Sequence, residues 1–108
     1  MTKRFEEAMR MMRHRDPQMQ EDGFGVLEPH AAEHLDELIE AFREEQDRGL
    51  RAWLFELIAA ARDSKALPLL VQHLVDDDLR GYAVHGLVVL DTKEARTALY
   101  RDRANGED

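Results

Sequence analysis

An internal repeat of about thirty residues largely determines how this chain can fold. Three aspartates, Asp16, Asp47 and Asp76, each precede a stretch with helical periodicity, and they lie 31 and 29 residues apart. In the second and third copies an arginine follows after four residues, as Arg51 and Arg80. An aspartate caps free N–H groups at a helix start, and an Asp-to-Arg pair at this spacing adds modest support. A repeat of this length predicts a stacked array of similar units.

Each copy continues into a second stretch of helical periodicity. In the first copy, apolar residues recur at the i, i+3, i+4, i+7 spacing of one helix face: Leu35, Leu38, Ile39 and Phe42. The segments 63–70 and 91–99 match one another with one inserted residue. The sequence therefore predicts two helices in each copy.

The pattern predicts an all-α fold, a short α-solenoid of about three helix pairs with an N-terminal capping helix. Residues 3–14 form the amphipathic cap, in which Phe5 and Met9 face inward while the basic side chains can face water. The repeats are expected at about 16–46, 47–75 and 76–103, within a single domain of 108 residues. Seven helices are expected in all.

Charge is unevenly distributed along the chain, whose formal net charge is −8. Residues 1–15 carry five basic and two acidic residues, whereas residues 16–47 carry eleven acidic residues and one arginine. The acidic third of the molecule repels phosphate backbones, which argues against a nucleic-acid partner. A basic protein partner is electrostatically favoured.

The sequence gives no sign of export or of membrane insertion. It contains no cysteine, its first residues lack the apolar core of a signal peptide, and no apolar run approaches the length of a membrane span. We therefore expect a cytoplasmic protein without disulfides.

The second and third copies share a more specific signature, which consists of an acid, an aliphatic–arginine pair, spaced Ala or Leu and an acidic turn. In the second copy these positions are Asp47, Leu50, Arg51, Leu54, Leu57 and Asp63. In the third they are Asp78, Leu79, Arg80, Ala83, Leu87 and Asp91. Over residues 16–101 the chain resembles the short HEAT-like repeats of the phycobilisome-lyase type, armadillo-like α-solenoids found in small bacterial repeat proteins. The first copy departs from the signature, with Gln20 in place of the arginine and two glycines, Gly23 and Gly25, inside its first helix.

The resemblance implies a solenoid whose second helices line a concave side, and it does not imply one function. Enzymes among the relatives attach bilins, hydroxylate with iron held by His-Glu dipeptides, or bind DNA in a basic groove. Their features are not found in this acidic chain, which has no His-Glu dipeptide. We therefore expect no catalytic residue, no cofactor and no enzymatic activity.

Histidines and aromatic residues are further candidates for functional or structural roles. His30 and His34 form an H-x-x-E-H pattern, which can hold zinc when a third ligand is present. The alternative is a helix start with two solvent-facing histidines, and we expect no metal site. His73 occupies the register of Phe42 and is expected to be a partly buried structural residue. Trp53 and an equivalent tyrosine, Tyr82, are expected to lie in the core.

The most informative candidate site is a stripe of acidic residues opposite the apolar face of the second helix. It consists of Glu33, Glu37, Glu40 and Glu44. Along the repeat alignment the same surface continues through Val71 in the second copy, and through Lys93 and Tyr100, with Arg96 beside them, in the third. The sequence predicts a groove that is acidic, then apolar, then aromatic and basic. The alternative is that the glutamates form a solvated face.

Two functions from different classes fit these features. The first is a protein-interaction module, an adaptor or regulator, that binds a basic and partly apolar segment in its concave groove. The second is a small acidic inhibitor, such as an immunity protein that blocks a basic toxin or nuclease. Apolar end faces also leave weak self-association through the ends open.

Overall fold

The computed structural model describes residues 1–106 and shows seven α-helices over that range. They are α1 Lys3–Met12, α2 Pro17–Leu27, α3 Leu35–Glu44, α4 Arg48–Ala60, α5 Leu67–Gln72, α6 Arg80–Leu90 and α7 Lys93–Gly106. Three single 3₁₀ turns accompany them: η1 Glu28–His30, η2 Ser64–Ala66 and η3 His73–Val75. The expected all-helical class and the seven helices are confirmed over the described residues, none of which lies in a strand. None of these helices combines the length and hydropathy needed to cross a bilayer.

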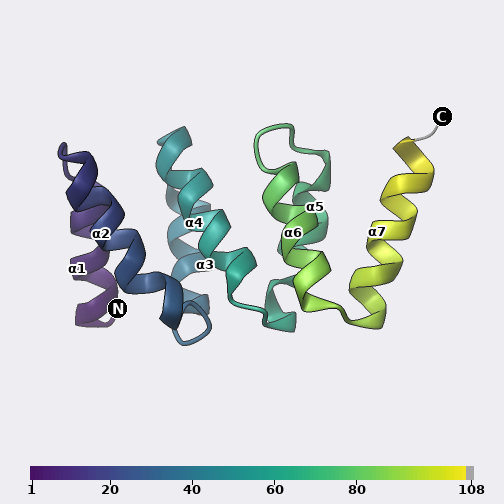
Figure 1. Ribbon diagram of the computed structural model, residues 1–108, viewed down its shortest axis with the longest axis horizontal. Helices are drawn as coiled ribbons and strands as arrows, with labels where there is room; N and C mark the ends of the chain where they lie inside the picture. The colour runs from purple at the N-terminus through teal and green to yellow at the C-terminus, as the bar shows by residue number, and fades with distance from the viewer. Residues whose placement is uncertain (107–108) are drawn as a thin grey trace.

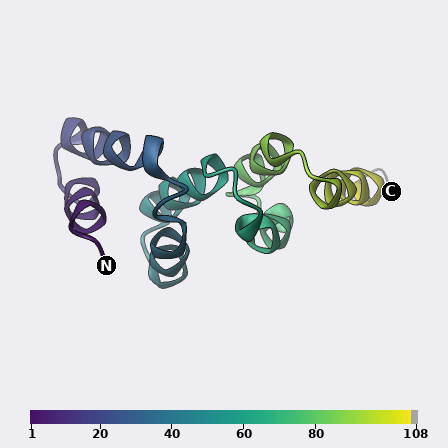
Figure 2. The ribbon, with the colours of Figure 1, turned by 90° about the horizontal axis from the view of Figure 1, so that it is seen from below.

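The helices follow one another in chain order along the longest axis of a particle of 43 × 24 × 21 Å (Figure 1). Viewed from below, α2, α4 and α6 form one row, with α1, α3 and α5 beside them in a second row and α7 at the far end (Figure 2). The close neighbours are α1 with α2, α3 with α4, and α6 with α4, α5 and α7. Apart from α6 with α7, these pairs join helices on either side of the expected repeat boundaries at residues 16, 47 and 76.

Polar side chains start most of these helices where the sequence predicts. The carboxylate of Asp16 accepts a hydrogen bond from the Gln18 N–H, and that of Asp47 accepts one from the Leu50 N–H. Asp63 accepts one from Lys65 at the turn before α5. Asp76 instead accepts from the Asp78 N–H in a turn, and α6 begins later without a side-chain cap. Asp16 and Asp47 therefore have the capping role that the repeat implies.

The two repeated arginines do not pair with their own aspartates. The Arg51 guanidinium lies 4.1 Å from the ring centroid of Phe42, which is a cation–π contact. Arg80 donates to both carboxylate oxygens of Asp102, at 2.8 and 2.7 Å, and thereby joins α6 to α7. The expected pairing four residues apart is wrong, because each arginine reaches a neighbouring helix instead.

The core is centred on α4 and on an aromatic cluster beside it. Leu54, Phe55, Leu57 and Ile58 of α4 are fully buried, as expected for a helix with neighbours on several sides. The rings of Phe42, Phe55 and His73 are in mutual contact, with centroids 5.1–5.2 Å apart. His73 is buried, and its Nδ1 lies 2.8 Å from the carbonyl oxygen of Leu69. The expected structural role of His73 is confirmed.

The two aromatic residues expected in the core lie at its margin instead. Trp53 and Tyr82 are both half-buried and pack against the core without entering it. The Trp53 ring contacts Phe24 of α2, with centroids 5.2 Å apart. The centre of the core is occupied by Phe42 and Phe55 instead.

The glycines inside α2 have different surroundings. A Cβ atom on Gly23 would lie 2.7 Å from the carbonyl oxygen of Ala8 and 2.9 Å from two side-chain carbons of α1. A Cβ atom on Gly25 would meet nothing within 4 Å. Gly23 therefore permits the close approach of α1 and α2, which offsets its low helix propensity.

Candidate functional site

The acidic stripe is not a uniform row of free carboxylates. Glu33 lies in the turn before α3, where its carboxylate accepts a hydrogen bond from Arg4 at 3.1 Å and lies 3.1 Å from the Nδ1 of His30. The hydrogen bond with His30 and the charge of Arg4 hold the pKa of Glu33 below its ordinary value. Glu33 is exposed but already paired.

Glu37 joins the start of α1 to the start of α3. Its carboxylate accepts a hydrogen bond from the backbone N–H of Thr2 at 2.8 Å and lies 2.7 Å from the Nδ1 of His34. Partial burial by itself raises the pKa of Glu37, but the hydrogen bonds from His34 and Thr2 outweigh it and keep the pKa below its ordinary value. Glu37 is therefore a connecting residue between two helices.

The histidine pair is not arranged as expected for either interpretation. His34 is buried at 5% exposure, with its ring 5.9 Å from that of Phe5, so it does not face solvent. Its Nε2 atom is buried and has no hydrogen-bond partner among the described residues. Within residues 1–106, no three His, Asp or Glu side chains are grouped as metal ligands would be. The solvent-facing interpretation is wrong for His34, because this side of the turn packs under α1.

We expect Glu37→Gln to lower the free energy of unfolding by about 1 kcal/mol at pH 7, because the ionised form of Glu37 makes the stronger hydrogen bonds. The folded-state pKa of Glu37 is below that of the unfolded chain, about 4.3. Its stabilising contribution is therefore complete above that value and is lost as the pH falls through the folded pKa. Denaturant titrations at pH 7, 5 and 3 should show the difference shrinking toward acid.

Glu40→Gln is the matched control for this prediction, because Glu40 lies nearly one turn further along α3, exposed and without an ion pair within residues 1–106. It should change stability little at any of the three pH values. If Glu37→Gln lowered the free energy of unfolding by the same amount at all three pH values, the charge of Glu37 would not be the source of its stabilising effect.

Two carboxylates of the expected stripe remain available to contact a binding partner. Glu40 and Glu44 are both exposed on α3, one turn apart, and neither makes an ion pair with another described residue. They therefore share one face of the helix. The acidic surface predicted from four glutamates is reduced to these two.

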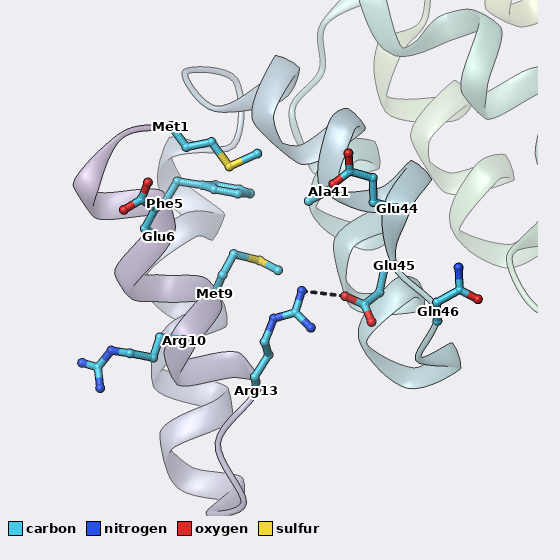
Figure 3. A pocket seen from close by; sticks show the side chains of 10 residues that line it. All are labelled: Met1, Phe5, Glu6, Met9, Arg10, Arg13, Ala41, Glu44, Glu45 and Gln46. Carbon is cyan, nitrogen blue, oxygen red and sulfur yellow. Dashed lines mark hydrogen bonds and ion pairs between the residues drawn. The ribbon is translucent and has the colours of Figure 1, made fainter.

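Glu44 lies at a groove between α1 and α3, with a volume of about 680 Å³. The groove exists because α1 packs against α2 and α3 packs against α4, whereas α1 and α3 are not close neighbours. The side chain of Met1, which precedes α1, and those of Phe5 and Met9 on α1 point toward α3, where Ala41 lies opposite them (Figure 3). Phe5 and Met9 are nearly buried, while Met1 is 61% exposed. The groove thus has an apolar floor and a methionine at its edge.

An ion pair closes one end of this groove. The guanidinium of Arg13 donates to the carboxylate of Glu45 at 2.7 Å, and the Glu45 side chain is only 7% exposed. Arg10 is on the same helix but points away from α3 and pairs with Glu7. The charges of Arg13 and Glu45 cancel one another, so Glu44 is the unpaired charge on the α3 wall.

A second, smaller groove lies on the other side of α3 and has a volume of about 450 Å³. Its lining is more polar and includes both Glu40 and Glu44. Lys65, from η2, faces Asp36 across it at 4.0 Å. Glu44 therefore stands on the ridge between two grooves.

The remaining predicted site residues are not brought into either groove. Val71 is 39% exposed on α5, and Tyr100 is 75% exposed on α7. Lys93 and Arg96 are exposed on α7, where Arg96 pairs with Asp91 at 2.9 Å. The structure brings Glu40 and Glu44 together and leaves the apolar and basic positions on other helices.

Comparison with known proteins assigns no family to this chain. A scan against protein-family models, a search of curated proteins and a search of solved structures find no significant match. The interpretation of the site therefore depends on its own geometry.

The groove-lining residues that sequence reasoning missed include Met1, Glu6, Ala41, Glu45 and Gln46. Phe5 and Met9 were expected to face inward, and both are buried, at 1% and 8% exposure, below the surface of the groove. The signal in the sequence is the apolar stripe of residues 3–14. It indicates a buried face without showing how completely the next helix covers it.

Proposed function

We propose that this protein is a protein-interaction module of the short α-solenoid type that binds a basic, partly apolar segment in the groove between α1 and α3. The order of the helices along one axis and the aspartate caps support the solenoid, as does the HEAT-like signature of the second and third copies. The proposal includes a cytoplasmic location and no catalytic activity.

The observation that carries the proposal is a groove with partly exposed apolar side chains and an unpaired carboxylate on its α3 wall. Grooves that bind peptides commonly supply an apolar anchor site and a few polar groups that fix orientation. Here Met1 and Ala41 supply the accessible apolar surface over the buried Phe5 and Met9, and Glu44 supplies the charge. Methionine side chains adapt to differently shaped apolar partners, so Met1 and Met9 suit an anchor of variable shape.

The acidic-inhibitor alternative is less well supported. An inhibitor that imitates a polyanion needs a continuous surface of free carboxylates. Glu33, Glu37 and Glu45 are engaged with Arg4, Thr2 and Arg13 inside the molecule. We therefore favour a binding groove over a polyanionic face.

The proposal can be tested with a random twelve-residue peptide library displayed against the immobilised protein. The native protein should enrich peptides that carry an aromatic or aliphatic residue flanked by Lys or Arg. For the enriched peptides, Glu40→Lys with Glu44→Lys should weaken binding at least about tenfold, or 1.4 kcal/mol, by fluorescence titration. Binding should also weaken as the salt concentration rises.

Glu21→Lys with Asp77→Lys is the matched control, because both residues are exposed and lie outside the grooves around α3. It changes the net charge equally and should leave peptide binding intact. Equal loss in both variants would mean that only overall charge matters. Enrichment of peptides with no basic residue would contradict the proposal.

A further inference from the structure

The far end of the molecule carries a surface of the kind that the groove would bind. Helix α7 packs chiefly against α6, with Ala95 buried and Ala98, Leu99 and Asp102 half-buried. At 100° per residue, Lys93, Thr97 and Tyr100 lie on the opposite side of this helix. They are exposed, and Tyr100 is one of the most exposed large apolar side chains of the described chain.

Basic residues flank this tyrosine on α7. Lys93, Arg101 and Arg103 are exposed and form no ion pair within residues 1–106, whereas Arg96 pairs with Asp91. Arg103 follows Tyr100 by one turn, and Lys93 precedes it by two turns. The outer face of α7 is therefore a basic helix with one aromatic residue at its centre.

We propose that the groove between α1 and α3 of one copy binds the outer face of α7 of a second copy, so that the protein self-associates head to tail. This inference rests on the proposed function, because it uses the same groove and names its occupant. Tyr100 is the anchor against Met1 and Ala41, above the buried Phe5 and Met9, and Arg103 faces Glu44. A tyrosine suits this position because its ring is apolar and its hydroxyl stays hydrated at the edge.

The distance between the two surfaces excludes a contact within one molecule. The groove lies at one end of a particle whose longest dimension is 43 Å, and α7 lies at the other, held there by α6 and by the Arg80–Asp102 pair (Figure 1). The two surfaces of one molecule therefore cannot meet. Because they differ from one another, the contact is heterologous and continues into a chain or closes into a ring.

The inference can be tested by sedimentation velocity of the full-length protein from low to high micromolar concentration. At low salt the mean mass should rise with concentration, and 0.5 M salt should reverse the rise. Glu40→Lys with Glu44→Lys should prevent the groove from binding α7 of a second copy. Tyr100→Ala with Arg103→Glu should prevent α7 from binding to the groove of a second copy. Each variant alone should remain monomeric, and an equimolar mixture should form a dimer that grows no further.

The mixing result separates this arrangement from the alternatives. A symmetric contact between two identical ends would leave one of the two variants able to dimerise by itself, which would overturn the head-to-tail inference. A native protein that is monomeric at every concentration would also overturn it. If that monomer still binds basic peptides through Glu44, the proposed function survives and only the named occupant is wrong.

The absence of cysteine from the sequence permits a second measurement that keeps both Glu44 and Arg103. Gln46→Cys and Thr97→Cys are single exposed substitutions at the groove and on the outer face of α7. Under mild oxidation, a mixture of the two should form the mixed disulfide dimer faster than Glu21→Cys mixed with Thr97→Cys. Equal rates in the two mixtures would contradict the contact.

Discussion

Replacing Phe55 by alanine is expected to lower the free energy of unfolding by about 3–5 kcal/mol, the largest single effect that we expect in this chain. Phe55 is fully buried on α4, and its ring contacts both Phe42 and His73. Truncation removes aromatic contacts from three helical segments and leaves a cavity that they cannot all fill. A domain of this size has only about 5–15 kcal/mol of stability, so the loss is a large fraction of the total and should clearly lower the denaturation midpoint.

Trp53→Ala on the same helix is the comparison for this prediction. Trp53 is larger than Phe55 but half-buried, with Phe24 as its aromatic neighbour. Its loss should therefore cost clearly less than the loss of Phe55, by chemical denaturation of both variants. If Trp53→Ala proves the more damaging, the centre of the core lies between α2 and α4, and not around Phe42.

The second large effect is expected at Gly23, where Gly23→Val should cost about 3 kcal/mol, at the upper end for an overpacked site. The added Cβ would meet the carbonyl oxygen of Ala8, which is backbone and cannot rotate away. To relieve the contact, α1 has to move outward from α2. Because α1 forms one wall of the groove, the folded fraction of this variant should also bind basic peptides more weakly than the native protein.

Gly25→Val is the matched control, two residues along the same helix. A Cβ atom there meets nothing, and valine has a higher helix propensity than glycine, so stability should stay equal or rise by a few tenths of a kcal/mol. Thermal melts followed by circular dichroism distinguish the two variants. Similar losses in both would mean that helix propensity, and not the approach of α1, sets the requirement at Gly23.

The helices and two of the three repeat-start caps could be predicted because both depend on local sequence. The aspartates at 16 and 47 cap helices through contacts two or three residues away, which a repeat alignment detects. The arginines that follow them could not be assigned in the same way. Arg51 and Arg80 reach residues on other helices, and their partners depend on how those helices are placed.

The candidate site was only partly predictable for the same reason. Helical periodicity places Glu37, Glu40 and Glu44 on one side of their helix, but it carries no information about what lies opposite each of them. Thr2, at the start of α1, donates a hydrogen bond to Glu37, whereas Glu40 and Glu44 form no ion pair with another described residue. The apolar floor of the groove comes from residues 3–14, which periodicity alone indicates only as a buried face.

The packing of α7 against essentially one other helix has a consequence for amide hydrogen exchange. Opening can start at α7, which is held chiefly by α6, without breaking the contacts around α4. Amides of α7 should therefore exchange through local fraying, and those of α4 only through opening of the whole domain. A ligand in the groove should slow exchange in α1 and α3, whereas a second copy bound to α7 should slow it at the opposite end. The exchange pattern thus indicates which end of the molecule is engaged before the partner is known.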